Sequence, residues 1–203
     1  MEERWHRVLA LAANASHDNV GRTIADLAKE RNADSGWDTL FDLMIEEGLR
    51  IKGLMLTSEA FAEEDNRMVL EHPLCSVESN TMALANDGPL AGPMMSVLGF
   101  NWVPRFLGHY VRDEGILIAE EGVRRLTGLP AGRLGLHDRG HLKQGYGADV
   151  VVFDLARLRD NSSFEDPTVY ADGIDQVFVN GALVFNEGLR TGEHGGRVLR
   201  PTT

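Results

Sequence analysis

The arrangement of short apolar runs restricts the fold of this chain more than any other feature, because it changes character near Leu136. Before that point, continuous apolar runs alternate with segments whose apolar residues recur at helical spacing. Such runs suit strands buried on both faces, and strands that alternate with helices favour parallel βα units. After that point the pattern is that of strands alone. The sequence therefore predicts an α/β region at 1–135 and a small all-β region at 136–203.

The first region is predicted to contain both strands and helices. Continuous apolar runs predict strands at 8–13, 51–56 and 74–77. Apolar residues at helical spacing predict helices at 24–28, 37–45, 58–70, 95–111 and 118–126. Gly48, Pro73 and the run Gly128-Leu129-Pro130 are expected to end three of these helices, because Gly favours a helix terminus and Pro cannot continue a helix.

The second region is predicted to be a small sheet. Strands are expected at 150–153, 174–179 and 182–185, with an edge strand at 197–199. Asn180-Gly181 separates the middle two strands, and this dipeptide is the strongest short signal for a type I′ hairpin turn. Gly147 and Asp149 precede the first strand, where Asp149 is expected to satisfy nearby backbone donors.

Composition excludes several classes of partner. The net charge is −11 and no stripe of Lys or Arg is present. A nucleic acid or an anionic membrane surface is therefore not an expected partner, because both bind through clustered cations.

The most apolar later segment, 94–111, is interrupted by Pro104, Arg105 and His109, so it does not predict a membrane span. Residues 1–16 do not resemble a signal peptide, and a cytoplasmic protein is expected.

Motifs along the chain point to a known family. In the second region they are GYGADVVVFDLARL at 145–158 and IDQVFVNGALVFNEGLRTGEHGGRVLR at 174–200. Upstream they are AFAEEDNRMVLEHP at 60–73, LANDGPLAGP at 84–93, RFLGHYVRDEG at 105–115 and TGLPAGRLGLHDRG at 127–140. Together they resemble the C-terminal portion of amidohydrolase-superfamily enzymes of the N-acyl-D-amino-acid deacylase (D-aminoacylase) type. The resemblance covers nearly the whole chain.

The resemblance implies an α/β fold: the last strands and helices of a TIM-like (β/α) barrel, followed by a small C-terminal β domain. Residues 1–135 would be the C-terminal part of the barrel, with 74–77 as its eighth strand, and 136–203 a β-sandwich-type domain. A complete (β/α)₈ barrel takes about 250 residues. A chain of 203 residues is too short to hold one, so the barrel is expected to be partial.

The resemblance also implies a chemistry. Enzymes of this type hold zinc at the carboxyl-terminal rim of the barrel through an H-x-H pair, further ligands on middle strands and an aspartate after the eighth strand. Zinc lowers the pKa of bound water to about 7. The aspartate takes the proton of that water and passes it to the departing amine. The implied substrate is an acylated D-amino acid, which yields a carboxylate and a free D-amino acid.

This sequence departs from that metal site. It has no H-x-H, and its histidines are scattered: His6, His17, His72, His109, His137, His141 and His194. Each is expected to be a surface or hydrogen-bonded histidine, and Cys75, the only cysteine, to be a packed thiol. By the resemblance, the ligand-bearing strands would precede Met1. No residue is therefore assigned as a metal ligand, and the chain alone is expected to bind no zinc.

Asn80 is the candidate catalytic position. The resemblance aligns it, within VESNTMALANDGPL at 77–90, with the family's rim aspartate, which is thus replaced by an amide. An amide cannot accept a proton at neutral pH and is a poorer zinc ligand than a carboxylate. Two carboxylates lie nearby in the sequence. Glu78 is expected to be a rim or ion-paired residue, and Asp87 to form a turn.

Three interpretations remain open. The first is an enzyme fragment, the C-terminal segment of a zinc-dependent amidohydrolase, inactive alone and completed by an N-terminal companion chain or by self-association. The second is a degenerate, non-catalytic amidohydrolase-like module for binding or assembly, which Asn80 favours. The third is that Met1 is an internal start and the natural chain is longer. Acyl and side-chain specificity do not follow from the sequence, because the substrate-contacting loops belong mostly to the rest of the barrel.

Overall fold

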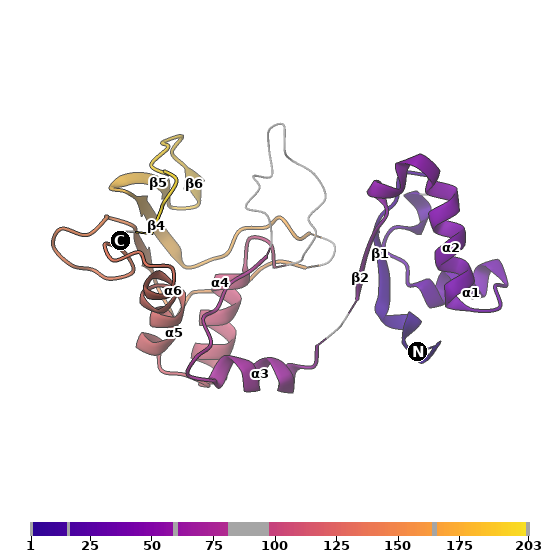
Figure 1. Ribbon diagram of the computed structural model, residues 1–203, viewed down its shortest axis with the longest axis horizontal. Helices are drawn as coiled ribbons and strands as arrows, with labels where there is room; N and C mark the ends of the chain where they lie inside the picture. Colours follow the sequence, from indigo (N-terminus) through magenta and orange to yellow (C-terminus); the bar gives the residue numbers. More distant parts are fainter. Residues whose placement is uncertain (1, 16, 59–60, 81–97, 164–165, 202–203) are drawn as a thin grey trace. The chain divides into compact units, whose positions relative to one another are not determined.

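The computed structural model describes residues 2–15, 17–58, 61–80, 98–163 and 166–201 of the chain (Figure 1). By their contacts these residues form two compact units, one at 2–63 and one at 64–80 together with 98–201. The division by contacts differs from the predicted boundary near Leu136, which stays a prediction. None of the helices in the described part combines the length and the apolar character that crossing a membrane requires.

The first unit is a two-stranded sheet with a helical excursion between its strands. Its elements are η1 (Glu2–Arg7), β1 (Val8–Ala12), η2 (His17–Asn19), α1 (Ile24–Arg31), α2 (Gly36–Glu47), η3 (Gly48–Gly53) and β2 (Met55–Ser58). Thr23 and Ser35 begin the two α-helices, because their side chains accept backbone N–H groups of the first turn. The core of the unit consists of three buried aliphatic side chains: Ile24, Leu27 and Leu43.

The helices of this unit confirm the expectation from the sequence, but its strand pairing does not. α2 ends at Glu47, and Gly48 follows with a φ of 52°. The second strand begins only at Met55, because a 3-10 helix occupies the residues before it. β1 and β2 are antiparallel, so the expected parallel pairing is wrong here. Two α-helices separate the strands, and the second adds a reversal of chain direction that a single crossover helix would not make.

The second unit begins with helices that surround a buried cluster. In the described residues they are α3 (Glu63–Glu71), α4 (Trp102–Pro104), the π-helix η4 (Arg105–Asp113), α5 (Ala119–Leu126) and α6 (Gly128–Arg133). The cluster consists of Phe106, Leu107, Tyr110, Val111 and Leu158. The apolar stripe expected over 95–111 therefore packs in the core from Val103 onward. Residues 95–97 lie outside the described residues.

One expectation for the helical part of this unit is wrong. Residues 74–77 form no strand, because their backbone groups bond to helices instead: Val77 N–H donates to the carbonyl of Arg125 at 3.2 Å. The helix expected at 118–126 ends at Leu126, just before the run at 128–130, as predicted, and the run itself opens a further helix, α6. Pro130 lies in the first turn of α6, where its missing N–H would have no intrahelical partner in any case.

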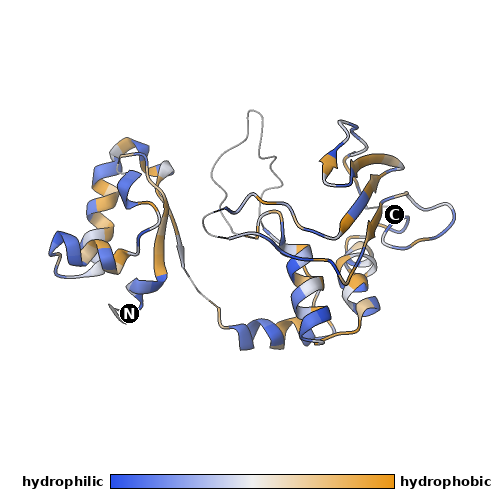
Figure 2. Ribbon diagram, turned by 180° about the vertical axis from the view of Figure 1, so that it is seen from behind, coloured by the Kyte–Doolittle hydropathy of each residue, from blue (hydrophilic) through white to orange (hydrophobic). Residues whose placement is uncertain are grey.

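A four-stranded antiparallel sheet completes the second unit (Figure 1). Its order is β3 (Val150–Phe153), β4 (Ile174–Val179), β5 (Ala182–Asn186) and β6 (Leu189–Arg190). Asn180 and Gly181 have φ of 48° and 84°, which confirms the predicted hairpin. Residues 197–199 do not form the expected edge strand, and β6 is the edge strand instead. It follows a tight turn at Glu187 and Gly188, whose φ values are 47° and 86°. Figure 2 shows the strands as largely hydrophobic.

A buried arginine joins the start of the sheet to its hairpin. Arg139 is 6% exposed; it pairs with the carboxylate of Asp149 and donates to Asn180 Oδ1 at 2.6 Å. Asp149 also accepts the backbone N–H of Asn180 at 2.8 Å, so its expected role toward backbone donors is confirmed. A Cβ on Gly147 would lie 2.9 Å from the guanidinium carbon of Arg139, so a larger residue there would push this guanidinium out of place.

Candidate functional site

Asn80 lies at the end of an irregular segment that follows α3, and its side chain is exposed. Glu78, on the same segment, is also exposed. Asp87 lies outside the described residues. Within the described part of the chain, the predicted site therefore consists of an amide and a carboxylate on residues 72–80, which we call the post-α3 segment. Its assignment as the reactive position stays a prediction.

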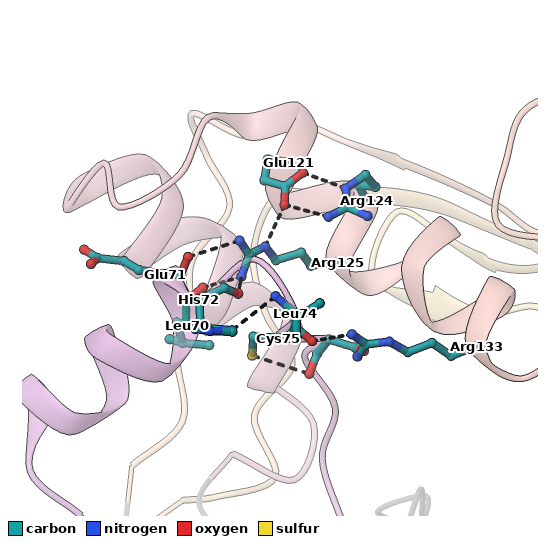
Figure 3. A network of polar contacts seen from close by, with 10 residues as sticks. Leu70, Glu71, His72, Leu74, Cys75, Glu121, Arg124, Arg125 and Arg133 are labelled. Carbon is teal, nitrogen blue, oxygen red and sulfur yellow. Dashed lines mark hydrogen bonds and ion pairs between the residues drawn. The ribbon is translucent and has the colours of Figure 1, made fainter.

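A buried guanidinium from α5 binds the last carbonyl groups of α3 (Figure 3). Arg125 is 2% exposed, and its Nη1 donates to the carbonyl oxygens of Leu70 and His72, both at 2.6 Å. Its Nη2 donates to the carbonyl of Glu71 at 3.3 Å. The last carbonyls of a helix have no intrahelical partners, and they carry the negative end of the helix dipole. Arg125 therefore acts as a cationic cap for α3.

Glu121 balances the charge of this buried arginine. Its Oε1 accepts Arg125 Nε at 2.9 Å, and its Oε2 accepts Arg124 Nε at 2.6 Å (Figure 3). Hydrogen bonds from Arg124 and then from Arg125 lower the pKa of Glu121 from 4.5 to about 2. A buried cation is costly unless it is paired and hydrogen-bonded, and Arg125 is both.

A second arginine, from α6, holds the middle of the post-α3 segment (Figure 3). Arg133 donates to the carbonyl of Leu74 through Nη2 and to the hydroxyl of Ser76 through Nη1. Cys75 lies between them, half-buried, with its sulfur 3.6 Å from the carbonyl oxygen of Ser76. Helices α5 and α6 together thus provide the hydrogen-bond partners that a neighbouring strand would otherwise supply.

An ion pair ties the body of α3 to η4. Arg67 donates to both carboxylate oxygens of Glu114, at 2.6 and 2.9 Å. These bonds hold the pKa of Glu114 below its ordinary value. His109 Nε2 lies 3.0 Å from the same carboxylate, which confirms the expectation of a hydrogen-bonded histidine at this position. α3 is therefore held along its length as well as at its end.

The metal-binding residue types do not converge. Among the residues that the structure describes, no three His, Cys, Asp or Glu side chains gather closely enough to hold a metal ion. His137 and His141 are exposed in the loop between α6 and β3, as expected. The His72 ring accepts the backbone N–H of Leu74 at 3.3 Å. His6, His17 and His194 are exposed.

The structure contains a groove that sequence reasoning did not foresee. It encloses about 590 Å³ beside α5 and β3, and its lining is mostly apolar, including Leu107, Val123, Leu126, Val151 and Phe153. The continuous apolar run at 150–153 was the available signal, because such a strand suits apolar surroundings on both faces. None of the described residues 64–80 lines the groove, so it is not part of the candidate site.

Comparison with a family profile and with individual known proteins points to the same family. The profile described as "Amidohydrolase family" matches residues 76–185. The chain is similar to the D-aminoacylase of Alcaligenes xylosoxydans xylosoxydans, with 54% identity over 99 residues, which are 49% of this chain and 20% of that protein.

Solved structures extend the similarity to nearly the whole chain. A D-aminoacylase studied for its binuclear metal centre matches with a TM-score of 0.81 and 33% identity, over 96% of this chain and 38% of its own. The N-acyl-D-glutamate deacylase of Bordetella bronchiseptica, solved with zinc and a phosphonate inhibitor, matches with a TM-score of 0.73 and 29% identity, over 98% and 37%. The chain thus spans well under half the length of these relatives.

Proposed function

Because the chain belongs to the amidohydrolase family, we propose that it forms the C-terminal part of a hydrolase that cleaves the amide bond of N-acyl-D-amino acids, and that it is inactive alone. The observation that carries this proposal is the likeness to D-aminoacylase, with a TM-score of 0.81 over 96% of the chain. One of the similar proteins is named as a deacylase of N-acyl-D-glutamate, and the others are named as D-aminoacylases. Hydrolysis of such a substrate gives a carboxylate and a free D-amino acid.

The described residues do not fit the zinc site of these relatives. Zinc in a hydrolase takes three protein ligands drawn from imidazole, thiolate and carboxylate groups. In the described part of this chain, no three such groups meet. The metal-holding groups would therefore come from a companion chain, or from protein that lies outside the described residues. No step of the reaction is assigned to this chain through a metal.

The post-α3 segment is what this chain contributes to the reaction site. Asn80 Nδ2 can donate and Oδ1 can accept a hydrogen bond, but the amide cannot take up a proton at neutral pH. Asn80 would therefore bind and orient the substrate rather than act as the general base. Glu78, exposed on the same segment, is the carboxylate that would hold or move a proton if this chain supplies one.

A second candidate function is a non-catalytic module for binding or assembly, which the amide at Asn80 favours. The two candidates differ in the expected effect of Asn80→Asp in an assembly with a companion. Turnover that appears only in this variant would mean that the natural chain lacks the reactive acid and serves as a module. Turnover with the natural Asn80 would favour the enzyme part.

The test is co-production of this chain with the N-terminal portion of a D-aminoacylase relative, in the presence of zinc. We expect the assembly to release free D-amino acid from N-acyl-D-amino acids and to leave the L enantiomers intact. The companion alone and the chain alone are the controls. An assembly that forms but releases no amino acid, with either the natural chain or its Asn80→Asp variant, would contradict the proposal.

A further inference from the structure

We infer that Arg125 is a positioning residue that fixes the path of the chain from the end of α3 to Asn80. Only the part of the inference that concerns turnover at Asn80 rests on the proposed function. The contacts that carry it are a property of this chain. They come from both the side chain and the main chain of Arg125.

The side chain of Arg125 donates hydrogen bonds to successive carbonyl groups. Those of Leu70, Glu71 and His72 all accept from its two terminal nitrogens (Figure 3). A planar guanidinium presents its donors in a fixed fork, so these bonds restrict the direction in which the chain leaves α3. A lysine ammonium has no such fork and cannot reproduce the arrangement.

The main chain of Arg125 holds the segment a second time. Its carbonyl oxygen accepts the N–H of Val77 at 3.2 Å. The stretch from His72 to Val77 is thus anchored at both ends by one residue. Asn80 follows shortly after the second anchor, so its position depends on the placement of Arg125.

Burial makes this anchor specific to Arg125. At 2% exposure it is surrounded by protein, and its Nε is paired with Glu121. Arg124 binds the same carboxylate, yet 43% of its side chain is exposed, and its guanidinium donates to Glu121 rather than to the post-α3 segment. Arg124 is therefore a matched control of the same type, on the same helix, with the same acidic partner.

Hydrogen–deuterium exchange of the chain itself tests the geometry. We expect Arg125→Gln to raise the exchange rates of residues 72–80 by about tenfold or more, because hydrogen bonds to a charged group are lost. Exchange in β4 and β5 should change little, and Arg124→Gln should leave both regions near wild type. Equal exchange of residues 72–80 in the two variants would overturn the inference.

If Arg125→Gln unfolds the second unit, Arg125→Lys is the variant that tests the geometry by exchange. It keeps a cation beside Glu121 but cannot span the carbonyls, so exchange should rise in residues 72–80 and not in the sheet. A rise of similar size throughout the second unit would make Arg125 a general stability residue. That result would also overturn the inference.

Kinetics of the assembly with a companion test the consequence. We expect Arg125→Lys to lower kcat by roughly 10- to 100-fold, because small misplacements of a reacting group are costly, and to leave KM within about twofold. Arg124→Gln should alter neither. Unchanged kcat per folded assembly in Arg125→Lys would contradict a positioning role. A wild-type assembly without turnover would instead contradict the proposed function, and the exchange experiment would still decide the geometry.

Discussion

Two parts of the second unit are held in different ways. The sheet β3–β6 is held by backbone ladders and by tight turns at Asn180-Gly181 and Glu187-Gly188. The post-α3 segment has no strand partner among the described residues, and long side chains from α5 and α6 hold it instead. A ladder spreads its hydrogen bonds over many residues, whereas the segment depends on two arginines. Substitutions of single side chains should therefore act locally in the segment, and backbone changes should act broadly around the sheet.

The largest expected effect comes from Gly173→Ala, just before β4. Gly173 has a φ of 85°, and an added Cβ would lie 2.6 Å from the backbone of Leu158, which is itself 1% exposed. We expect a loss of about 4 kcal/mol in the free energy of unfolding, from strain and overpacking together. Chemical denaturation measures it.

Gly192→Ala is the control for this change. Gly192 has a similar φ of 86°, but nothing lies within 4 Å of an added Cβ. A cost of only about 1 kcal/mol is expected there, from backbone conformation alone. Equal losses for the two variants would mean that close packing against Leu158 is not what the sheet region depends on.

Arg139→Gln should have the next largest effect, because it removes a buried cation that joins Asp149 to Asn180. Breaking a buried pair costs about 3 kcal/mol. Thermal or chemical unfolding should show this loss, while Arg197→Gln should cost under about 0.5 kcal/mol because Arg197 is exposed. If Arg139→Gln were as mild as Arg197→Gln, the hairpin would be held by its ladder alone.

Arg133→Gln should have a smaller and more local effect. It removes bonds to Leu74 and Ser76 but leaves the contacts of Arg125 in place. Because Arg133 is exposed, we expect a cost of about 1 kcal/mol in global stability. Faster amide exchange confined to residues 74–77 would support the comparison, and faster exchange in β4 would break it.

The smallest expected effect is that of acid pH on the α3 cap, because it does not act near neutral pH. The pKa of Glu121 is lowered from 4.5 to about 2 in the folded chain, so its carboxylate stabilises the fold fully above about pH 4.5. This contribution is lost as pH falls from 4.5 toward 2. The difference in thermal stability between wild type and Glu121→Gln should therefore shrink over that range. A difference that stays constant over that range would contradict this role of the Glu121 carboxylate.

Local signals explain what could be predicted from the sequence. Helices α1, α2 and α5 follow from apolar spacing, and the β4–β5 hairpin from its Asn-Gly turn, since each depends on neighbours in sequence. The antiparallel pairing of β1 with β2 was missed, because strand direction depends on how the chain packs over a long excursion. The irregular path at 74–77 was missed because its partners, Arg125 and Arg133, are far away in sequence.

The candidate site was only partly predictable for the same reason. Asn80 could be singled out through the resemblance to a family, and the structure places it on an exposed segment. Nothing in that comparison pointed to Arg125. The structure gives the reason for its role, since Arg125 follows the buried Gly122 by one helical turn and therefore falls on the inward face of α5. A charged residue at such a position needs buried partners, and the carbonyl groups at the end of α3 are those partners.

The most direct test of the account is a zinc titration of the purified chain, followed by an assay with an N-acyl-D-amino acid. We expect no stoichiometric zinc binding and no release of D-amino acid by the chain alone, with release appearing once the companion is added. One-to-one zinc binding and turnover by the chain alone would contradict the claim that it is one part of a divided active site.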